Sequence, residues 1–97
     1  MTLKLKQFGT ILISRPAGKE AFWVLQSTLK DLKEKETVKI DFDGVEVFSP
    51  GWGDEVLTPL LNAYGERLVL RKSGNGSVVA TLDILEQQHG KKFNVAG

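Results

Sequence analysis

Cysteine is absent from the 97 residues of the chain, and histidine occurs only once. Without cysteine there are no disulfides and no thiolate nucleophiles, and the commonest ligands of structural zinc are missing. The single histidine, His89, belongs to no spacing typical of a metal site, and we expect it to be a satisfied residue at a helix end. No nucleophile, base and orienting group can be recognised together, so we expect neither an enzyme nor a bound cofactor or metal.

Long hydrophobic runs and an excess of one charge are lacking too. The first six residues alternate between polar and apolar side chains, unlike a signal peptide or a transmembrane helix. The formal net charge is +1, which indicates neither a nucleic-acid partner nor an acidic membrane surface. Lys4 and Lys6 are explained more simply as protection of a solvated strand edge. We therefore expect a cytoplasmic protein without nucleic-acid or membrane partners.

What the chain does contain is the composition of one small folded domain, with 41% hydrophobic and 26% charged residues. Strand-like and helix-like segments follow one another in the order β-β-α-β-α-β-α. Because a helix between two strands favours parallel pairing, we predict an α/β fold, a small and mainly parallel sheet with helices packed against it. We expect residues 1–97 to form this single domain, with 90–97 as a frayed tail or a short extension packed by Phe93.

The N-terminal part of the chain predicts two strands and a helix. Apolar residues indicate strands over 3–8 and 11–13, which form a first hairpin or else one bent strand. Ser14 is placed to cap a helix whose apolar stripe covers 21–32. The charged run 30–36 is expected to form the solvated last turns of that helix.

Two clear core strands are predicted further along the chain, over 38–42 and 68–70. The glycine-rich turn 74–76 follows the second of them and leads into a last helix, which Ser77 is expected to cap and Gly90 to end. The third glycine of a dinucleotide-binding fingerprint is absent after this turn, and so is a phosphate-binding lysine. We therefore interpret 74–76 as a plain turn.

The helix between these two strands is expected to start after a loop that begins at residue 49. Asp54 and Glu55 would then lie in its first turn, where the helix dipole favours negative charge. Pro59 lies inside the helical pattern, and we favour a single kinked helix over one that restarts with Thr58 as its cap. Gly65 ends this helix.

Five carboxylates lie near the turn at 43–44, namely Asp41, Asp43, Glu46, Asp54 and Glu55. The plain interpretation is that Asp43 forms the turn while Asp54 and Glu55 complement the helix N-terminus. A general acid–base pair or a Mg²⁺ site built from Asp41, Asp43 and Asp54 would require these side chains to converge, and the pattern gives no support for that.

Trp52 is placed unusually, between two glycines in a loop at a helix start. Such a large apolar side chain can fold back as a lid on the core. It can equally stay exposed as an anchor for a partner protein, because tryptophan is enriched at the centres of interfaces. The residues alone leave both interpretations open.

A family resemblance rests on four short segments and two single residues, namely Ser14-Arg15, 40–45, Ser49-Pro50, Asp54-Glu55, Trp52 and Gly53. Together they resemble the STAS-like family of small domains. The motif of that family runs hydrophobic-Asp-Phe-x-Gly-Val, then Ser-Pro and an aromatic residue, and then an acidic pair at a helix start. The resemblance extends over roughly residues 8 to 88.

This resemblance implies a fold related to anti-sigma-factor antagonists and a function exerted by protein contact. In the wider group, a serine in the loop after the corresponding strand is phosphorylated by a partner kinase. Here that place falls on Gly51, which cannot be phosphorylated. Ser49, two residues earlier, either substitutes for it or caps the turn. The resemblance also implies a partner of the histidine-kinase-like ATPase type.

The leading hypothesis is therefore a non-enzymatic regulatory module that presents the loop and helix of 49–57 to a partner protein. The residues expected to contact the partner are Arg15, Ser49, Trp52, Asp54 and Glu55. A second hypothesis is a small-ligand or nucleotide-binding domain, because open α/β sheets bind ligands at the carboxyl ends of their strands. Those ends would bring Asp43 close to the turn 74–76.

Overall fold

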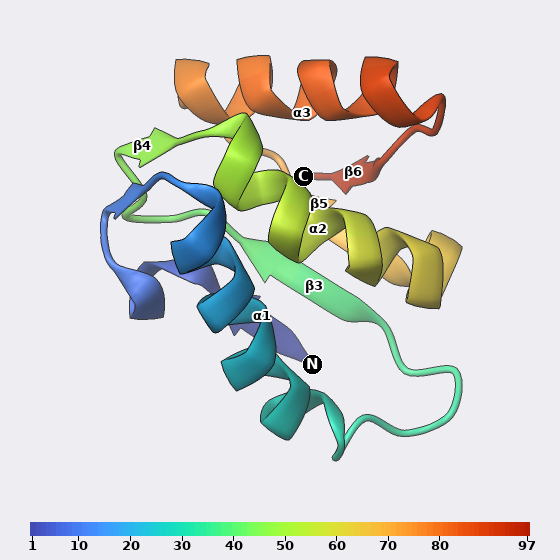
Figure 1. The fold of residues 1–97 in the computed structure, drawn as a ribbon. Helices are drawn as coiled ribbons and strands as arrows, with labels where there is room; N and C mark the ends of the chain where they lie inside the picture. The colour runs from blue at the N-terminus through green and yellow to red at the C-terminus, as the bar shows by residue number, and fades with distance from the viewer.

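A four-stranded sheet forms the centre of the protein, whose computed structural model describes residues 1–97 (Figure 1). Its strands are β1 (Thr2–Lys4), β3 (Val38–Asp41), β5 (Leu68–Arg71) and β6 (Asn94–Ala96). They lie in the order β1-β3-β5-β6, and every neighbouring pair is parallel. The predicted α/β class with a mainly parallel sheet is confirmed.

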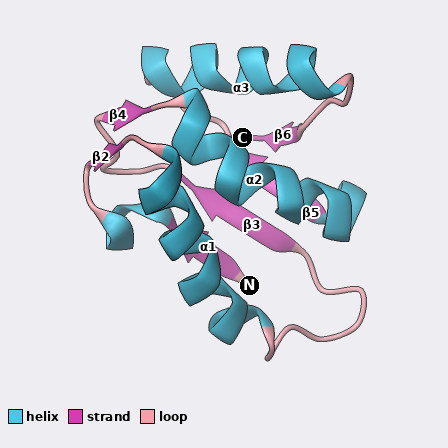
Figure 2. Cartoon of the chain, viewed as in Figure 1, coloured by secondary structure: helices cyan, strands magenta, loops and turns pink.

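Three α-helices cover the sheet, namely α1 (Arg15–Leu29), α2 (Pro50–Tyr64) and α3 (Gly76–His89). Each crossover moves one strand further in the same direction along the sheet. Right-handed crossovers that never reverse direction place their helices on one face. In Figures 1 and 2, α1 and α2 lie in front of the sheet, and α3 runs along the top, above β6. Along β3, Val38 and Ile40 accordingly point into the core, whereas Lys39 is exposed on the other face.

The core between helices and sheet contains 19 buried hydrophobic residues. Its largest member is Trp52, which is 1% exposed and stacks edge-on against Phe48 at a ring-centroid distance of 5.8 Å. Phe48 in turn makes an edge-on contact with Phe42 at 5.2 Å. These rings lie where β3 and β4 approach the start of α2, so they fix the position of that helix end.

A small second sheet replaces the predicted hairpin. It consists of β2 (Ile11–Leu12) and β4 (Val47–Phe48), which pair in parallel. The 3-10 helix η1 (Leu5–Phe8) separates β1 from β2, and Gly9 at φ 118° turns the chain away. Both the hairpin and the single bent strand are therefore wrong, because Leu5 is buried within a helical turn and each strand finds a distant parallel partner.

The start of α1 agrees with the prediction, but its end does not. The Ser14 hydroxyl accepts a hydrogen bond from the Ala17 amide at 3.4 Å and caps the helix. The helix stops at Leu29, so most of the charged run 30–36 lies in the following loop. Glu36 holds that loop, since its carboxylate accepts bonds from the Lys33 amide and the N-terminal ammonium, each at 2.9 Å.

The single helix predicted around Pro59 is confirmed, but α2 begins earlier than expected. Ser49 is its N-cap, and the Ser49 hydroxyl accepts a hydrogen bond from the Trp52 amide at 3.4 Å. Asp54 and Glu55 therefore lie in the second turn and not in the first. Their alignment with the helix dipole is correspondingly weaker than expected, because the effect is confined to the first turn.

The last helix begins differently from the prediction, and the C-terminal segment agrees with one of its two predicted forms, the short extension packed by Phe93. Asn75, not Ser77, caps α3, and its side-chain oxygen accepts bonds from the Ser77 and Val78 amides. Gly90 ends the helix in the left-handed conformation, as expected. The segment 90–97 is not a frayed tail, because β6 pairs with β5 and Phe93 is buried.

No helix of the protein unites the length and the apolar character that are needed to cross a membrane. The short 3-10 helix η2 (Gly65–Arg67) connects α2 to β5 and completes the set of elements.

Candidate functional site

Three of the predicted contact residues meet in one polar cluster at the ends of the helices. Arg15 begins α1, and its guanidinium donates to Asp54 of α2 at 2.7 Å and to Glu55 at 3.4 Å. Thr58, one turn further along α2, donates to Asp54 at 2.7 Å. His89 at the end of α3 places its Nε2 2.8 Å from the same carboxylate oxygen. We call these five residues the interhelical cluster, because they connect all three helices.

Asp54 is the electrostatic centre of this cluster. Partial burial opposes its charge, but hydrogen bonds from Thr58, Arg15 and His89 outweigh that penalty and lower the pKa of Asp54 from 3.8 to about 2. The hydrogen bond to Asp54 also raises the pKa of Arg15 above its ordinary value. Asp54 is thus a firmly ionised carboxylate that has several donors around it.

The combination of Thr58, His89 and Asp54 resembles the residue types of a catalytic triad, but its geometry is different. His89 presents the same nitrogen, Nε2, to Asp54 at 2.8 Å and to Thr58 at 3.4 Å. In a triad the imidazole uses one nitrogen for the acid and the other for the nucleophile. The Thr58 hydroxyl also gives its proton to Asp54. The cluster can therefore fix helices and hold charge, but it does not contain the relay that nucleophilic attack needs.

Sequence reasoning missed His89 and Thr58 as members of the cluster. The spacing of four residues between Asp54 and Thr58 places both on one helix face and could have indicated their contact. His89 lies 35 residues from Asp54 and belongs to another helix, so no local pattern connects the two.

Ser49 and Gly51 lie at the N-terminus of α2, beside the cluster. Ser49 is half-buried and caps the helix, which is one of the two roles considered for it. A Cβ atom at Gly51 would lie 3.2 Å from Cγ of Arg15, so the arginine side chain crosses the helix start at this position. Arg15 therefore partly fills the space beside Gly51, where the resemblance would place a phosphoacceptor serine.

Trp52 lies in the core and not on the surface. Its side chain is 1% exposed, which matches its interpretation as a lid and removes it from any contact surface. α1 crosses directly over its backbone, because a Cβ at Gly18 would lie only 2.8 Å from the Trp52 carbonyl oxygen. The close approach of α1 and α2 thus depends on Gly18, which the sequence pattern did not single out.

The exposed apolar residues near the cluster come instead from the small sheet. Ile11 and Val47 are register partners in β2 and β4, and they are 57% and 41% exposed. Ile13, two residues after Ile11, is 51% exposed. We call these three residues the ribbon patch. It borders both helix starts, because Ser14 directly follows Ile13 and Ser49 directly follows β4 along the chain.

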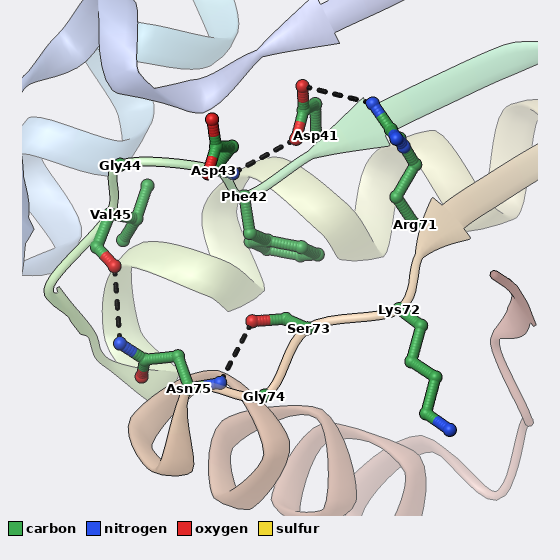
Figure 3. A pocket seen from close by; sticks show the side chains of 10 residues that line it. All are labelled: Asp41, Phe42, Asp43, Gly44, Val45, Arg71, Lys72, Ser73, Gly74 and Asn75. Carbon is green, nitrogen blue, oxygen red and sulfur yellow. Dashed lines mark hydrogen bonds and ion pairs between the residues drawn. The ribbon is translucent and has the colours of Figure 1, made fainter.

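A polar hollow lies at the carboxyl ends of β3 and β5 (Figure 3). It has a volume of about 410 Å³ and brings Asp43 close to Gly74, as the sequence predicted. Asp41 accepts bonds there from the Asp43 amide at 2.9 Å and from Arg71 at 3.4 Å. The Phe42 ring lies between the two loops in Figure 3, and most other lining groups are polar.

The three aspartates considered for a Mg²⁺ site do not act together. Asp41 and Asp43 line the hollow, whereas Asp54 is held in the interhelical cluster by Arg15 and His89. No group of three or more His, Cys, Asp or Glu side chains is arranged to hold a metal ion.

The comparisons with known proteins add one finding. A family model described as a STAS-like domain of unknown function (DUF4325) matches residues 23–76. The matched segment contains β3, β4, α2 and β5, and thus the loop that leads into α2. No curated protein and no solved structure matches the chain.

Proposed function

Because the chain belongs to the family of STAS-like domains of unknown function, we propose that it is a regulatory module that acts by binding another protein. The proposed docking surface consists of the ribbon patch and the charged residues beside it, Arg15 and Glu55. Such a module is not an enzyme. The module would act by shifting its partner towards the conformation to which the module binds more tightly.

The observation that carries this proposal is the exposed ribbon patch beside a charged helix start. Three branched aliphatic side chains are exposed together over β2 and its neighbour β4. Interfaces typically combine an apolar centre with a polar rim, and arginine is enriched among the residues that dominate binding energy. Arg15 is 52% exposed although Asp54 fixes its guanidinium, so the group is pre-oriented for a partner and loses little side-chain entropy on binding.

For the partner we propose a histidine-kinase-like ATPase, as the resemblance implies. Ser49 is then the hydroxyl of this surface that a kinase activity would modify. A phosphate on Ser49 would lie at the N-terminus of α2, where free amides and the helix dipole favour negative charge. Arg15 packs over the same helix start and would supply a cation.

The proposal is tested by capturing partners with the purified, tagged domain and quantifying them by mass spectrometry. Ile13→Asp or Val47→Asp should lose the main partner, because a buried charge at an interface centre is costly. Ile84→Asp is the matched control, since Ile84 is 40% exposed on α3 away from the ribbon patch. If both ribbon variants retain every partner of the wild type, the docking surface is elsewhere.

A second candidate function is the binding of a small polar ligand, and the hollow at the ends of β3 and β5 favours it. It ranks second because ligand crevices in open α/β sheets form where the strand order reverses, and this sheet has no such reversal. A thermal-shift screen of nucleotides decides between the two. A rise in melting temperature that Asp43→Ala abolishes would support a ligand site, since ligands that prefer the folded state stabilise it.

A further inference from the structure

The outward face of α1 carries a second apolar patch that the docking surface does not include. Trp23 is 79% exposed and Val24 is 56% exposed, whereas the other tryptophan, Trp52, is 1% exposed. Together with Glu20 and Ser27, they line a shallow surface depression of about 550 Å³. An almost fully exposed tryptophan beside a depression is typical of an interaction surface, since the ring gains much free energy when it is covered.

The charges on this face are arranged so that the face complements itself. Glu20 lies towards the N-terminal end of α1, and Lys30 is its C-cap. Both are exposed, and neither takes part in an ion pair within the chain. Along the chain each charge lies five residues from Leu25, which itself faces the core, so the level of Leu25 on the helix axis is the midpoint between them. If a second α1 runs antiparallel across this midpoint, each Glu20 meets a Lys30.

We propose that α1 is the interface of a homodimer in which the two α1 helices pack antiparallel about a twofold axis. In this arrangement Trp23 packs over Ser27 of the partner subunit, a small residue that leaves room for the ring. Residues with numbers that sum to 50 face each other, so the Glu20–Lys30 contact occurs twice. A twofold interface requires this kind of self-complementarity, because one surface patch must recognise itself.

The small area of the proposed contact indicates that the two chains associate weakly. α1 contains 15 residues and is therefore about 22 Å long. A single pair of such helices buries less than roughly 1,200 Å², which is the range of weak and transient complexes. We expect a reversible dimer with a dissociation constant on the order of 100 µM.

This inference is independent of the proposed docking function. The antiparallel arrangement points the two Arg15 ends of α1 in opposite directions, so it leaves both ribbon patches free. The dimer would then present two docking surfaces at once, and a partner with two matching sites would bind more tightly through the higher effective concentration.

Sedimentation equilibrium from about 5 to about 500 µM protein tests the dimer. For the wild type we expect the average mass to rise with concentration above the 10.7 kDa of one chain. Trp23→Ala, Glu20→Lys and Lys30→Glu should each weaken association by about tenfold or more. The double variant E20K/K30E should restore it, because both contacts are re-formed with exchanged signs. Val79→Ala, which changes another exposed apolar residue on α3, should leave association unchanged.

Three outcomes would overturn the proposal. The first is a wild type that stays at the mass of one chain over the whole range. The second is Val79→Ala weakening association as much as Trp23→Ala does, and the third is a double variant that associates no better than its single parents.

Tryptophan emission gives an independent check of the dimer. The exposed Trp23 should shift to shorter wavelength on association, while the buried Trp52 contributes a constant signal. An unchanged spectrum in a dimerising sample would place the interface elsewhere.

Discussion

Two aspartates each face an arginine in this protein, and the two pairs differ in geometry and in what they connect. Asp54 and Arg15 lie 2.7 Å apart, and Thr58 and His89 add two further contacts to the same carboxylate. Asp41 lies 3.4 Å from its arginine and otherwise accepts one bond from the backbone of its own turn. The first pair connects three helices, whereas the second stabilises a turn at the edge of a hollow.

The difference shows how position in the fold decides the task of an ion pair. The interhelical cluster lies where the ends of α1, α2 and α3 converge, so each of its bonds restrains one helix against another. The pair of Asp41 lies at the ends of two strands that the backbone already holds in register. The cluster should therefore contribute more to stability, and changes in the hollow should be better tolerated.

The largest loss of stability is expected when the Asp54 carboxylate is removed. Asp54→Ala leaves Arg15 and His89 without their common acceptor, and hydrogen bonds to charged groups are worth more than neutral ones. We expect the free energy of unfolding to fall by about 3 kcal/mol, measured by urea denaturation at neutral pH. Arg15→Ala alone should cost less, because Thr58 and His89 remain on Asp54. A loss below that of Arg15→Ala would contradict the central role of Asp54.

Acid should remove the contribution of the cluster selectively. The pKa of Asp54 is lowered from 3.8 to about 2, so its stabilising effect is complete above about pH 4 and is lost as the pH falls to about 2. The shift corresponds to a contribution of at most roughly 2 kcal/mol to the free energy of unfolding, and solvent screening reduces it because the cluster lies at the surface. Wild type and Asp54→Asn should therefore differ in stability at pH 6, and the difference should shrink by about pH 2.

The matched comparison of these two proteins also removes a competing effect. A backbone hydrogen bond from Lys33 lowers the pKa of Glu36, so Glu36 titrates in the same direction. Glu36 is present in both proteins, and its contribution cancels in the difference. A gap between the two proteins that stays constant from pH 6 to pH 2 would mean that Asp54 has an ordinary pKa.

Much of the fold could be predicted because its signals are local. Three such signals are the polar–apolar alternation of β3, the cap Ser14 and the stop at Gly90, since each depends on residues within a few positions. The apolar run of β5 is equally local. Strands of two or three residues, such as β2, β4 and β6, are too short to show a period. The structure forms them only because distant segments provide partners.

The site was less predictable, because its contacts are made between elements that are distant in the chain. Arg15, Asp54 and Glu55 were identified by resemblance and do meet. Trp52 could not be placed, since a tryptophan between glycines can face either way. The burial of Trp52 depends on its contact with the Phe48 ring. That ring packs tightly against the start of α2, since a Cβ atom at Gly53 would lie 2.9 Å from it. The ribbon patch was missed, because a short continuous apolar run such as 11–13 is typical of a buried strand and gives no sign that Ile11 and Ile13 stay exposed.

A smaller loss of stability is expected when the carboxylate of the other pair, Asp41, is removed. Asp41→Ala should lower the free energy of unfolding by about 1 kcal/mol, mainly through the lost bond from the Asp43 amide. Arg71→Ala should have almost no effect, because its side chain is 58% exposed and the ion pair is long. Equal losses for Asp41→Ala and Asp54→Ala in the same denaturation experiment would show that the two pairs do not differ as proposed.

The smallest effect is expected within the cluster itself, at Glu55. Its carboxylate lies 3.4 Å from Arg15, which is already bound by Asp54 at 2.7 Å, and no other hydrogen bond reaches it. Glu55→Gln should therefore change the free energy of unfolding by less than about 0.5 kcal/mol. It should nevertheless weaken binding of the captured partner, because Glu55 belongs to the proposed docking surface and its charge contributes to recognition. Unfolding curves and partner capture on the same preparation separate the two effects. A variant that loses stability but keeps the partner would assign Glu55 to the fold and remove it from the docking surface.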